Sequence, residues 1–170
     1  MMPPEMAETA AWCLFRSDAE PLAVALGAVV EVVEAKALAR WPAGVPRVLG
    51  LCSYRRGVLP VVRLTEPAPG VEDGATPLVL VLRKGVEAWG IRVDRGGTAV
   101  RRGGLDPAGA GRASAVGGRV RSIGMIEHEG AAFLAVDAAD AWEAIRAEVV
   151  AHDRAASTLS ASAAEDRGRP

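Results

Sequence analysis

The chain contains no asparagine and no glutamine, only two lysines against 18 arginines, and seven aromatic residues in 170. Without asparagine, the Asn-Gly turn that marks many β-hairpins cannot occur. Because the compositional bias runs through the whole chain, its arginine content is not by itself a sign of phosphate recognition. So few aromatic residues argue against a surface that stacks nucleic-acid bases.

Cysteine and histidine each occur only twice. Cys13 and Cys52 both lie in apolar runs, where a free cysteine behaves as a small hydrophobic residue. His128 lies in a turn between two glutamates, and His152 falls near the end of a predicted helix. No Cys/His spacing fits a zinc site, and neither a phosphate-binding loop nor a nucleophile elbow occurs. We therefore predict a non-enzymatic protein with no metal and no cofactor.

No apolar run approaches the roughly 20 residues needed to cross a bilayer. The N-terminal segment also lacks the long apolar core of a secretory signal. These features and the isolated cysteines predict a soluble, cytoplasmic, reduced protein without direct membrane insertion. The net charge of −1 provides no overall attraction to nucleic acid or to a membrane.

Charge is nevertheless distributed unevenly along the chain. Residues 83–121 carry nine basic and three acidic residues, a net of +6, whereas residues 1–34 and 122–170 each carry a net of −5. One interpretation is solvated loops of differing sign. Another is a module that docks through oppositely charged faces. A third is a small β-barrel that binds nucleic acid through the basic region 83–121.

Short apolar runs separated by turn-forming residues predict many short strands and one helix. Residues 28–35 are rich in valine and favour a strand, although their spacing also fits one or two helical turns. An amphipathic helix is predicted over 138–152, capped by Asp137 or Asp140. The remaining expectations are strands at 12–15 and 22–26, hairpins at 48–64, 78–93 and 123–136, a Pro/Gly-rich connection at 65–77, a short strand at 98–100, a flexible tail at 1–11 and a disordered tail at 154–170.

The hairpin at 48–64, VLGLCSYRRGVLPVVRL, is the most informative segment. Two apolar runs flank a basic, glycine-containing turn, as in a β-hairpin. Arg55 and Arg56 lie side by side in this turn, between strands that are expected to be buried. Exposed charge on a rigid support suits a binding surface.

Residues 50–64 resemble the central signature of the CheW-like domain family. That signature reads Gly-Leu, an aliphatic residue, Asn, Leu, Arg, Gly, a variable residue, Val, an aliphatic residue, Pro, Val, Val, Asp, Leu. Three further blocks follow the family's order, at 22–33, 89–94 and 123–137. Together the blocks cover about residues 12–145, and the hairpin is the most specific of them.

The resemblance implies a mainly β fold of two small five-stranded SH3-like β-barrels packed side by side, with a C-terminal α-helix. We place the domain at 12–153, with the first barrel centred on about 25–75 and the second on about 78–125. The implied function is an adaptor between the tip of a chemoreceptor and the regulatory domain of a CheA-type histidine kinase. The implied location is a cytoplasmic receptor array at the inner face of the membrane.

Site residues follow from the resemblance position by position. Arg55 matches the family arginine implicated in receptor contact, and Val29 matches an apolar position in the receptor groove between the barrels. Gly50 matches a position near the kinase-binding side. Arg56 replaces the family glycine and Arg63 replaces the family aspartate, which predicts a basic patch of three arginines. We assign Arg55, Arg56 and Val29 to receptor binding and Gly50 to kinase binding.

Each of these residues also has a purely structural interpretation. The stem of Arg55 would cover apolar surface, and Arg56 would be a solvated turn residue. Val29 would belong to the core, and Gly50 would only allow tight packing.

Overall fold

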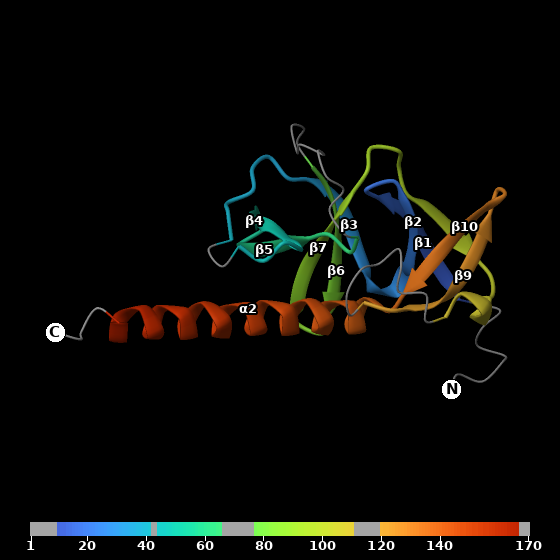
Figure 1. Cartoon of the computed structure of the whole chain (residues 1–170). Helices are drawn as coiled ribbons and strands as arrows, with labels where there is room; N and C mark the ends of the chain where they lie inside the picture. The colour runs from blue at the N-terminus through green and yellow to red at the C-terminus, as the bar shows by residue number, and fades with distance from the viewer. Residues whose placement is uncertain (1–9, 42–43, 66–76, 111–119, 167–170) are drawn as a thin grey trace.

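The computed structural model describes residues 10–41, 44–65, 77–110 and 120–166. Two five-stranded sheets form small barrels that lie side by side, and one long helix runs along them (Figure 1). This confirms the predicted mainly β fold and all three hairpins. The strands are β1 (Ala11–Ser17), β2 (Glu20–Ala25), β3 (Val29–Glu34), β4 (Val48–Tyr54), β5 (Gly57–Val62), β6 (Leu78–Lys84), β7 (Glu87–Val93), β8 (Ala99–Arg102), β9 (Ser122–His128) and β10 (Ala131–Val136), and the helix is α2 (Ala138–Asp166).

Strand order corrects the predicted division of the barrels. The central barrel has the order β3-β6-β7-β5-β4, and the terminal barrel has the order β8-β1-β2-β10-β9. We expected the hairpin 78–93 to open a second barrel, but β6 pairs with β3 and β7 pairs with β5. A Pro/Gly-rich connection ends a strand without preventing the strands on either side of it from pairing. Its residues 66–76 lie outside the described part of the chain.

The two barrels have the same spatial arrangement of strands, but the order of these strands along the chain is cyclically permuted. Strands β3, β4, β5, β6 and β7 of the central barrel correspond to β8, β9, β10, β1 and β2 of the terminal barrel. A parallel pair lies at the same place in each, β5 with β7 and β10 with β2. A glycine that faces a backbone carbonyl also recurs, Gly50 against Ala39 and Gly124 against Asp106. The sequence shows no detectable repeat, so this symmetry exists only at the level of the backbone.

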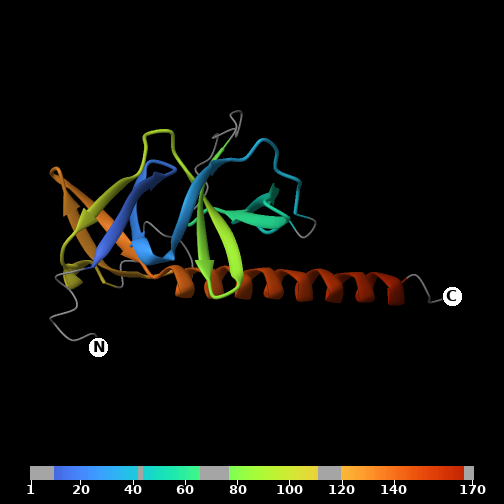
Figure 2. The ribbon, with the colours of Figure 1, turned by 180° about the vertical axis from the view of Figure 1, so that it is seen from behind.

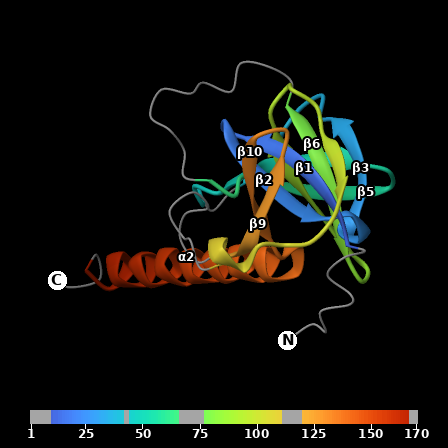
Figure 3. The ribbon, with the colours of Figure 1, turned by 90° about the vertical axis from the view of Figure 1, so that its right-hand side faces the viewer.

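The core explains why two strands are apolar without alternation. One cluster spans both barrels and includes Phe15 of β1 and Leu80 of β6. Leu14 of β1 packs inside the terminal barrel, and Val79 of β6 packs inside the central barrel. Both strands are therefore buried on both faces, as in a strand that is covered on each side. Figure 3, which looks onto the terminal barrel, shows β1 in front of β6.

Helix α2 is longer than predicted. It starts after Asp137, whose Oδ1 accepts a hydrogen bond from the backbone N–H of Asp140 at 2.9 Å, so Asp137 supplies the cap. It continues to Asp166, which corrects the disordered tail that we expected from residue 154. Residues 138–166 contain no glycine or proline and many alanines, the best helix formers.

Residues 28–35 were open to two interpretations. The structure has β3 there, preceded by a single 3₁₀ turn at Leu26–Ala28. The strand is favoured because β-branched valines pack well on a pleated surface.

Candidate functional site

Tyr54 and Arg55, at the turn between β4 and β5, contact Glu31 of β3, and we call these three polar side chains the Arg55 cluster. Arg55 Nη2 lies 2.8 Å from Glu31 Oε1, and the Tyr54 hydroxyl donates a hydrogen bond to the same oxygen at 2.5 Å. The Arg55 guanidinium also lies 5.2 Å from the centre of the Tyr54 ring. These contacts fix the turn to β3 and orient Arg55, whose side chain remains 67% exposed.

Electrostatics of the Arg55 cluster favour an ionised carboxylate. The hydrogen bond from Tyr54, followed by the one from Arg55, lowers the pKa of Glu31. Burial, followed by the hydrogen bond to Glu31, raises the pKa of Tyr54. The phenol therefore stays a donor and the carboxylate an acceptor near neutral pH.

The backbone of the turn places its strain at Arg55. This residue has φ of 52°, in the left-handed region, whereas Arg56 has no positive φ. Arg56 stands where the family signature has glycine, but the residue in the left-handed conformation is Arg55. A non-glycine residue there costs on the order of 1 kcal/mol. The contacts to Tyr54 and Glu31 help to hold that conformation.

Val29 and Arg56, the other two residues assigned to receptor binding, lie in different environments. Val29 is half-buried against the core that the barrels share, and it precedes Glu31 by two residues on β3. The structure thus brings Val29 and Arg55 onto one part of the molecule, linked through Glu31. Arg56 is exposed and forms no ion pair within the described residues.

Two residues of the Arg55 cluster and one surface feature were not predicted from the sequence. Glu31 and Tyr54 are 23 residues apart in the chain, and no sequence pattern indicates that their side chains meet. Val30 and Val32 are exposed by 38% and 41% on the outer face of β3. The signal that was available is the run of four valines in β3, which leaves the outward ones uncovered when the strand lies at a sheet edge.

Gly50 is buried, and its place is set by a close approach of the chain. A Cβ atom at this position would lie 2.5 Å from the carbonyl oxygen of Ala39, and φ is 154°. Ala39 and Leu51 exchange two backbone hydrogen bonds of 2.8 Å across the same point. Tight packing accounts for the glycine, and its assignment to kinase binding stays a prediction.

Arg63 does not belong to the basic patch of the turn, contrary to the prediction. It is only 4% exposed, and its Nε lies 3.9 Å from Asp18 Oδ2. Asp18 also lies 3.6 Å from Arg92 and accepts a 2.6 Å hydrogen bond from the Thr65 hydroxyl. The position is close to the contact between the barrels, where an arginine must be paired because isolated buried charge is costly.

Three of the nine basic residues in the region 83–121 form ion pairs with acidic residues elsewhere in the chain. Lys84 pairs with Glu143, Arg92 with Asp18, and Arg95 with Glu34. Residues 112 and 119 lie outside the described part of the chain. These pairs reduce the positive charge that the region offers to nucleic acid, and the nucleic-acid alternative stays a prediction.

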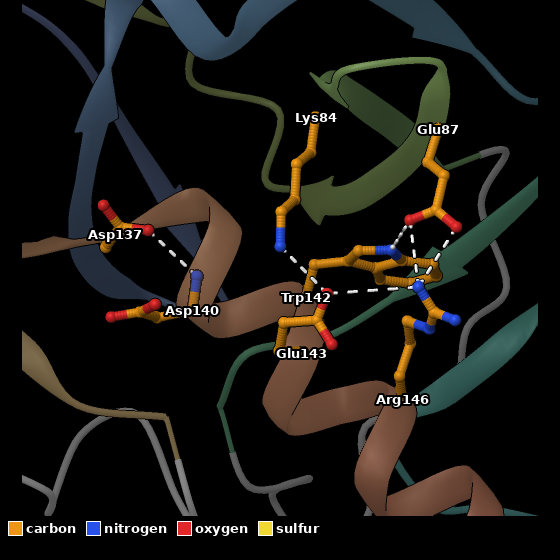
Figure 4. Close-up of polar contacts among 7 residues, drawn as sticks. All are labelled: Lys84, Glu87, Asp137, Asp140, Trp142, Glu143 and Arg146. Carbon is orange, nitrogen blue, oxygen red and sulfur yellow. Dashed lines mark hydrogen bonds and ion pairs between the residues drawn. The ribbon is translucent and has the colours of Figure 1, made fainter.

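The first turns of α2 are fixed to the β6–β7 hairpin (Figure 4). Trp142 stacks on Trp89 with a centroid separation of 5.3 Å and donates a hydrogen bond to Glu87 at 3.1 Å. Arg146 lies 3.0 Å from the same carboxylate, and Lys84 lies 2.9 Å from Glu143. The helix is therefore an integral part of the domain up to this point.

The described residues contain no group of three or more His, Cys, Asp or Glu side chains placed to hold a metal ion. No described helix is both long enough and apolar enough to span a membrane.

Comparison with known proteins gives one family and one fold. The family model for the CheW-like domain matches residues 12–139. No curated protein matches the chain. Among solved structures, the crystal structure of the scaffolding protein TtCheW from Thermoanaerobacter tengcongensis is similar, with a TM-score of 0.55 and 14% sequence identity over 75% of this chain and 88% of that one. At this identity, the structural likeness concerns the fold.

Proposed function

Because the chain belongs to the CheW-like domain family, we propose that it is a non-enzymatic adaptor between a chemoreceptor and a CheA-type histidine kinase. Its partners are the cytoplasmic tip of the receptor and the regulatory domain of the kinase. It acts in the cytoplasm, in receptor arrays at the inner face of the membrane. The described role of TtCheW as a scaffolding protein supports this proposal.

The Arg55 cluster is the observation that carries the receptor contact. Arg55 is oriented by Tyr54 and Glu31, yet most of its side chain faces solvent. An exposed ion pair contributes little to stability, so a receptor carboxylate can replace Glu31 at low cost. A side chain that is already oriented loses less entropy when it binds.

Neighbouring residues complete this surface. Arg56 adds a second exposed cation in the same turn, and Val29, half-buried beside the core that the barrels share, offers apolar contact. Apolar anchors surrounded by a polar rim are typical of protein interfaces. In this arrangement, the valine supplies contact area, and the arginines select an acidic partner segment.

The kinase contact is proposed on the side of the central barrel marked by Gly50. The backbone segment at residues 38–39 packs against β4 there, and β4 is at the end of the strand order in its sheet. Gly50 itself is buried, so its role is to keep this segment close to the strand. The kinase regulatory domain, itself CheW-like, would then pair barrel to barrel.

Isothermal titration with a receptor tip and a kinase regulatory domain tests the proposal. Arg55→Ala is expected to weaken receptor binding about ten-fold, or 1.4 kcal/mol, and to leave kinase binding unchanged. Arg95→Ala is the matched control, because Arg95 also forms an exposed 2.8 Å ion pair with a glutamate. Equal losses for both variants would assign the effect to net charge alone. If the folded protein binds neither partner, the adaptor function is wrong.

A further inference from the structure

An apolar pocket lies between α2 and the β4–β5 hairpin, and no residue of the Arg55 cluster lines it. Its volume is about 470 Å³, within the range of about 300–1,000 Å³ for ligand pockets. Trp41, Val48, Leu51, Val58, Pro60 and Val62 line one side, and Trp142, Ile145, Val149 and Val150 line the other. Arg146 also contributes, but its guanidinium is held by Glu87.

The two lips of the pocket are apolar and exposed. Val58, on β5, is 64% exposed, and Val150, on α2, is 48% exposed. Large apolar side chains that gather at one concave place on a surface mark an interaction site more often than scattered ones do. The two valines come from different elements and flank the same pocket, so they are not scattered.

Two arginines lie in sequence beside the hairpin wall. Arg40 precedes Trp41, and Arg56 precedes Val58 by two residues. Both are exposed, and neither forms an ion pair within the part of the chain that the structure describes. A partner that fills this pocket therefore gains if it carries acidic groups next to its apolar anchors.

The other wall of the pocket continues as a projecting helix. Helix α2 passes the β4–β5 hairpin and extends beyond it (Figures 1 and 2). The 16 residues from Ala151 to Asp166 span about 24 Å at 1.5 Å per residue. Residues 151–157 are all exposed. Helices of this length draw most of their stability from tertiary packing, so contact with a partner would stabilise this segment.

We propose that the pocket and the projecting part of α2 form a second docking surface, for an acidic amphipathic helix of a partner protein. The partner helix lies along α2, places apolar side chains between Val58 and Val150, and directs carboxylates toward Arg40 and Arg56. This is the helix-in-groove mode of recognition, with anchors at i, i+3, i+4 and i+7. The inference shares Arg56 with the proposed receptor surface, and its test therefore uses Val150 and Arg40, which that surface does not include.

A designed peptide tests this surface on the full chain. The probe is a fluorescein-labelled amphipathic helix with leucines at i, i+3, i+4 and i+7 and glutamates at the other faces. One control peptide carries lysines in place of the glutamates, and another carries serines in place of the leucines. Binding is measured by fluorescence anisotropy, and amide hydrogen exchange reports protection of residues 151–166.

The glutamate peptide is expected to bind at least about ten-fold more tightly than either control peptide. Val150→Glu should weaken it at least about ten-fold, because it places a charge on an apolar lip. Arg40→Glu should remove the preference for glutamate over lysine. Val86→Glu is the matched control, since Val86 is fully exposed in the β6–β7 turn and does not line the pocket.

Binding of the glutamate peptide with slower exchange in residues 151–166 supports the proposal. Absence of binding, equal binding of all three peptides, or equal effects of Val150→Glu and Val86→Glu overturns it. Sedimentation covers the remaining case. If the chain alone forms a dimer that Val150→Glu dissociates, the occupant is a second copy and the proposal is wrong.

Discussion

Replacing Asp18 with asparagine is expected to weaken the joint between the barrels. Asp18, in the β1–β2 turn of the terminal barrel, lies 3.9 Å from Arg63, which follows β5, and 3.6 Å from Arg92 on β7. The three side chains are exposed by only 6%, 5% and 18%. Asparagine keeps the shape and tolerates the φ of 51° at this position. The substitution therefore removes the charge without straining the turn.

The expected cost follows from the burial of the two guanidinium groups. Removing one partner of a buried ion pair costs about 3–5 kcal/mol. The amide oxygen of asparagine still accepts the hydrogen bond from Thr65, so we expect the lower end, about 3 kcal/mol. For a domain of this length, that loss lowers Tm by roughly 6–12 °C.

Urea denaturation followed by tryptophan fluorescence measures the loss, and calorimetry gives the change in Tm. Glu34→Gln is the matched control, because the Glu34–Arg95 pair is short, at 2.8 Å, but exposed on both sides. Its expected cost is below about 1 kcal/mol. If Asp18→Asn and Glu34→Gln cost the same, burial does not decide the strength of these pairs and the reasoning is refuted.

Three further variants test the site and the fold. Tyr54→Phe should raise the pKa of Glu31 toward its ordinary value of 4.5, measured by NMR titration, because the Tyr54 hydrogen bond is the main cause of the lowering. Ionised Glu31 stabilises the fold at pH values above its pKa in the unfolded chain, and this stabilisation is lost as the pH falls through its lower pKa in the folded protein. The stabilisation should be smaller in Tyr54→Phe. An unchanged pKa of Glu31 in this variant would contradict the prediction. Gly124→Ala should lower the free energy of unfolding by on the order of 2 kcal/mol, because the new Cβ would lie 2.6 Å from the Asp106 carbonyl oxygen. An unchanged free energy of unfolding would show that the strand can shift to accommodate the Cβ. Trp142→Ala should lower the free energy of unfolding by about 2–3 kcal/mol and speed amide exchange in α2, because it removes the stack on Trp89. Amide exchange that stays slow would show that other contacts hold the helix.

Local structure was predictable from the sequence, because its causes are local. The hairpin at 48–64 is indicated by two apolar runs around a basic, glycine-containing turn. The helix cap at Asp137 follows from a side chain that reaches a backbone N–H three residues on. Arg55 was assigned through a motif, and the structure adds the two neighbours that orient it.

Long-range pairing was not predictable in the same way. Nothing in the β6 run indicates that it pairs with β3 across the connection at 65–77, so the second barrel was given the wrong strands. Arg63 was expected beside Arg55, because both belong to one motif. Its burial depends on Asp18, which is distant in sequence and reaches it only when the barrels meet.

Because the chain is synthesised from its N-terminus, the permuted strand order determines which barrel can form first. All five strands of the central barrel fall between Val29 and Val93, so this barrel can close while the rest of the chain is still being made. The terminal barrel cannot, because β2 pairs with β10, Leu22 opposite Leu134. Until β10 has been synthesised, the β1–β2 hairpin lacks the strand that pairs with β2. A hairpin of two strands alone is marginally stable in water. The folded central barrel can stabilise this hairpin, because β1 and β2 contribute side chains to the core that the two barrels share.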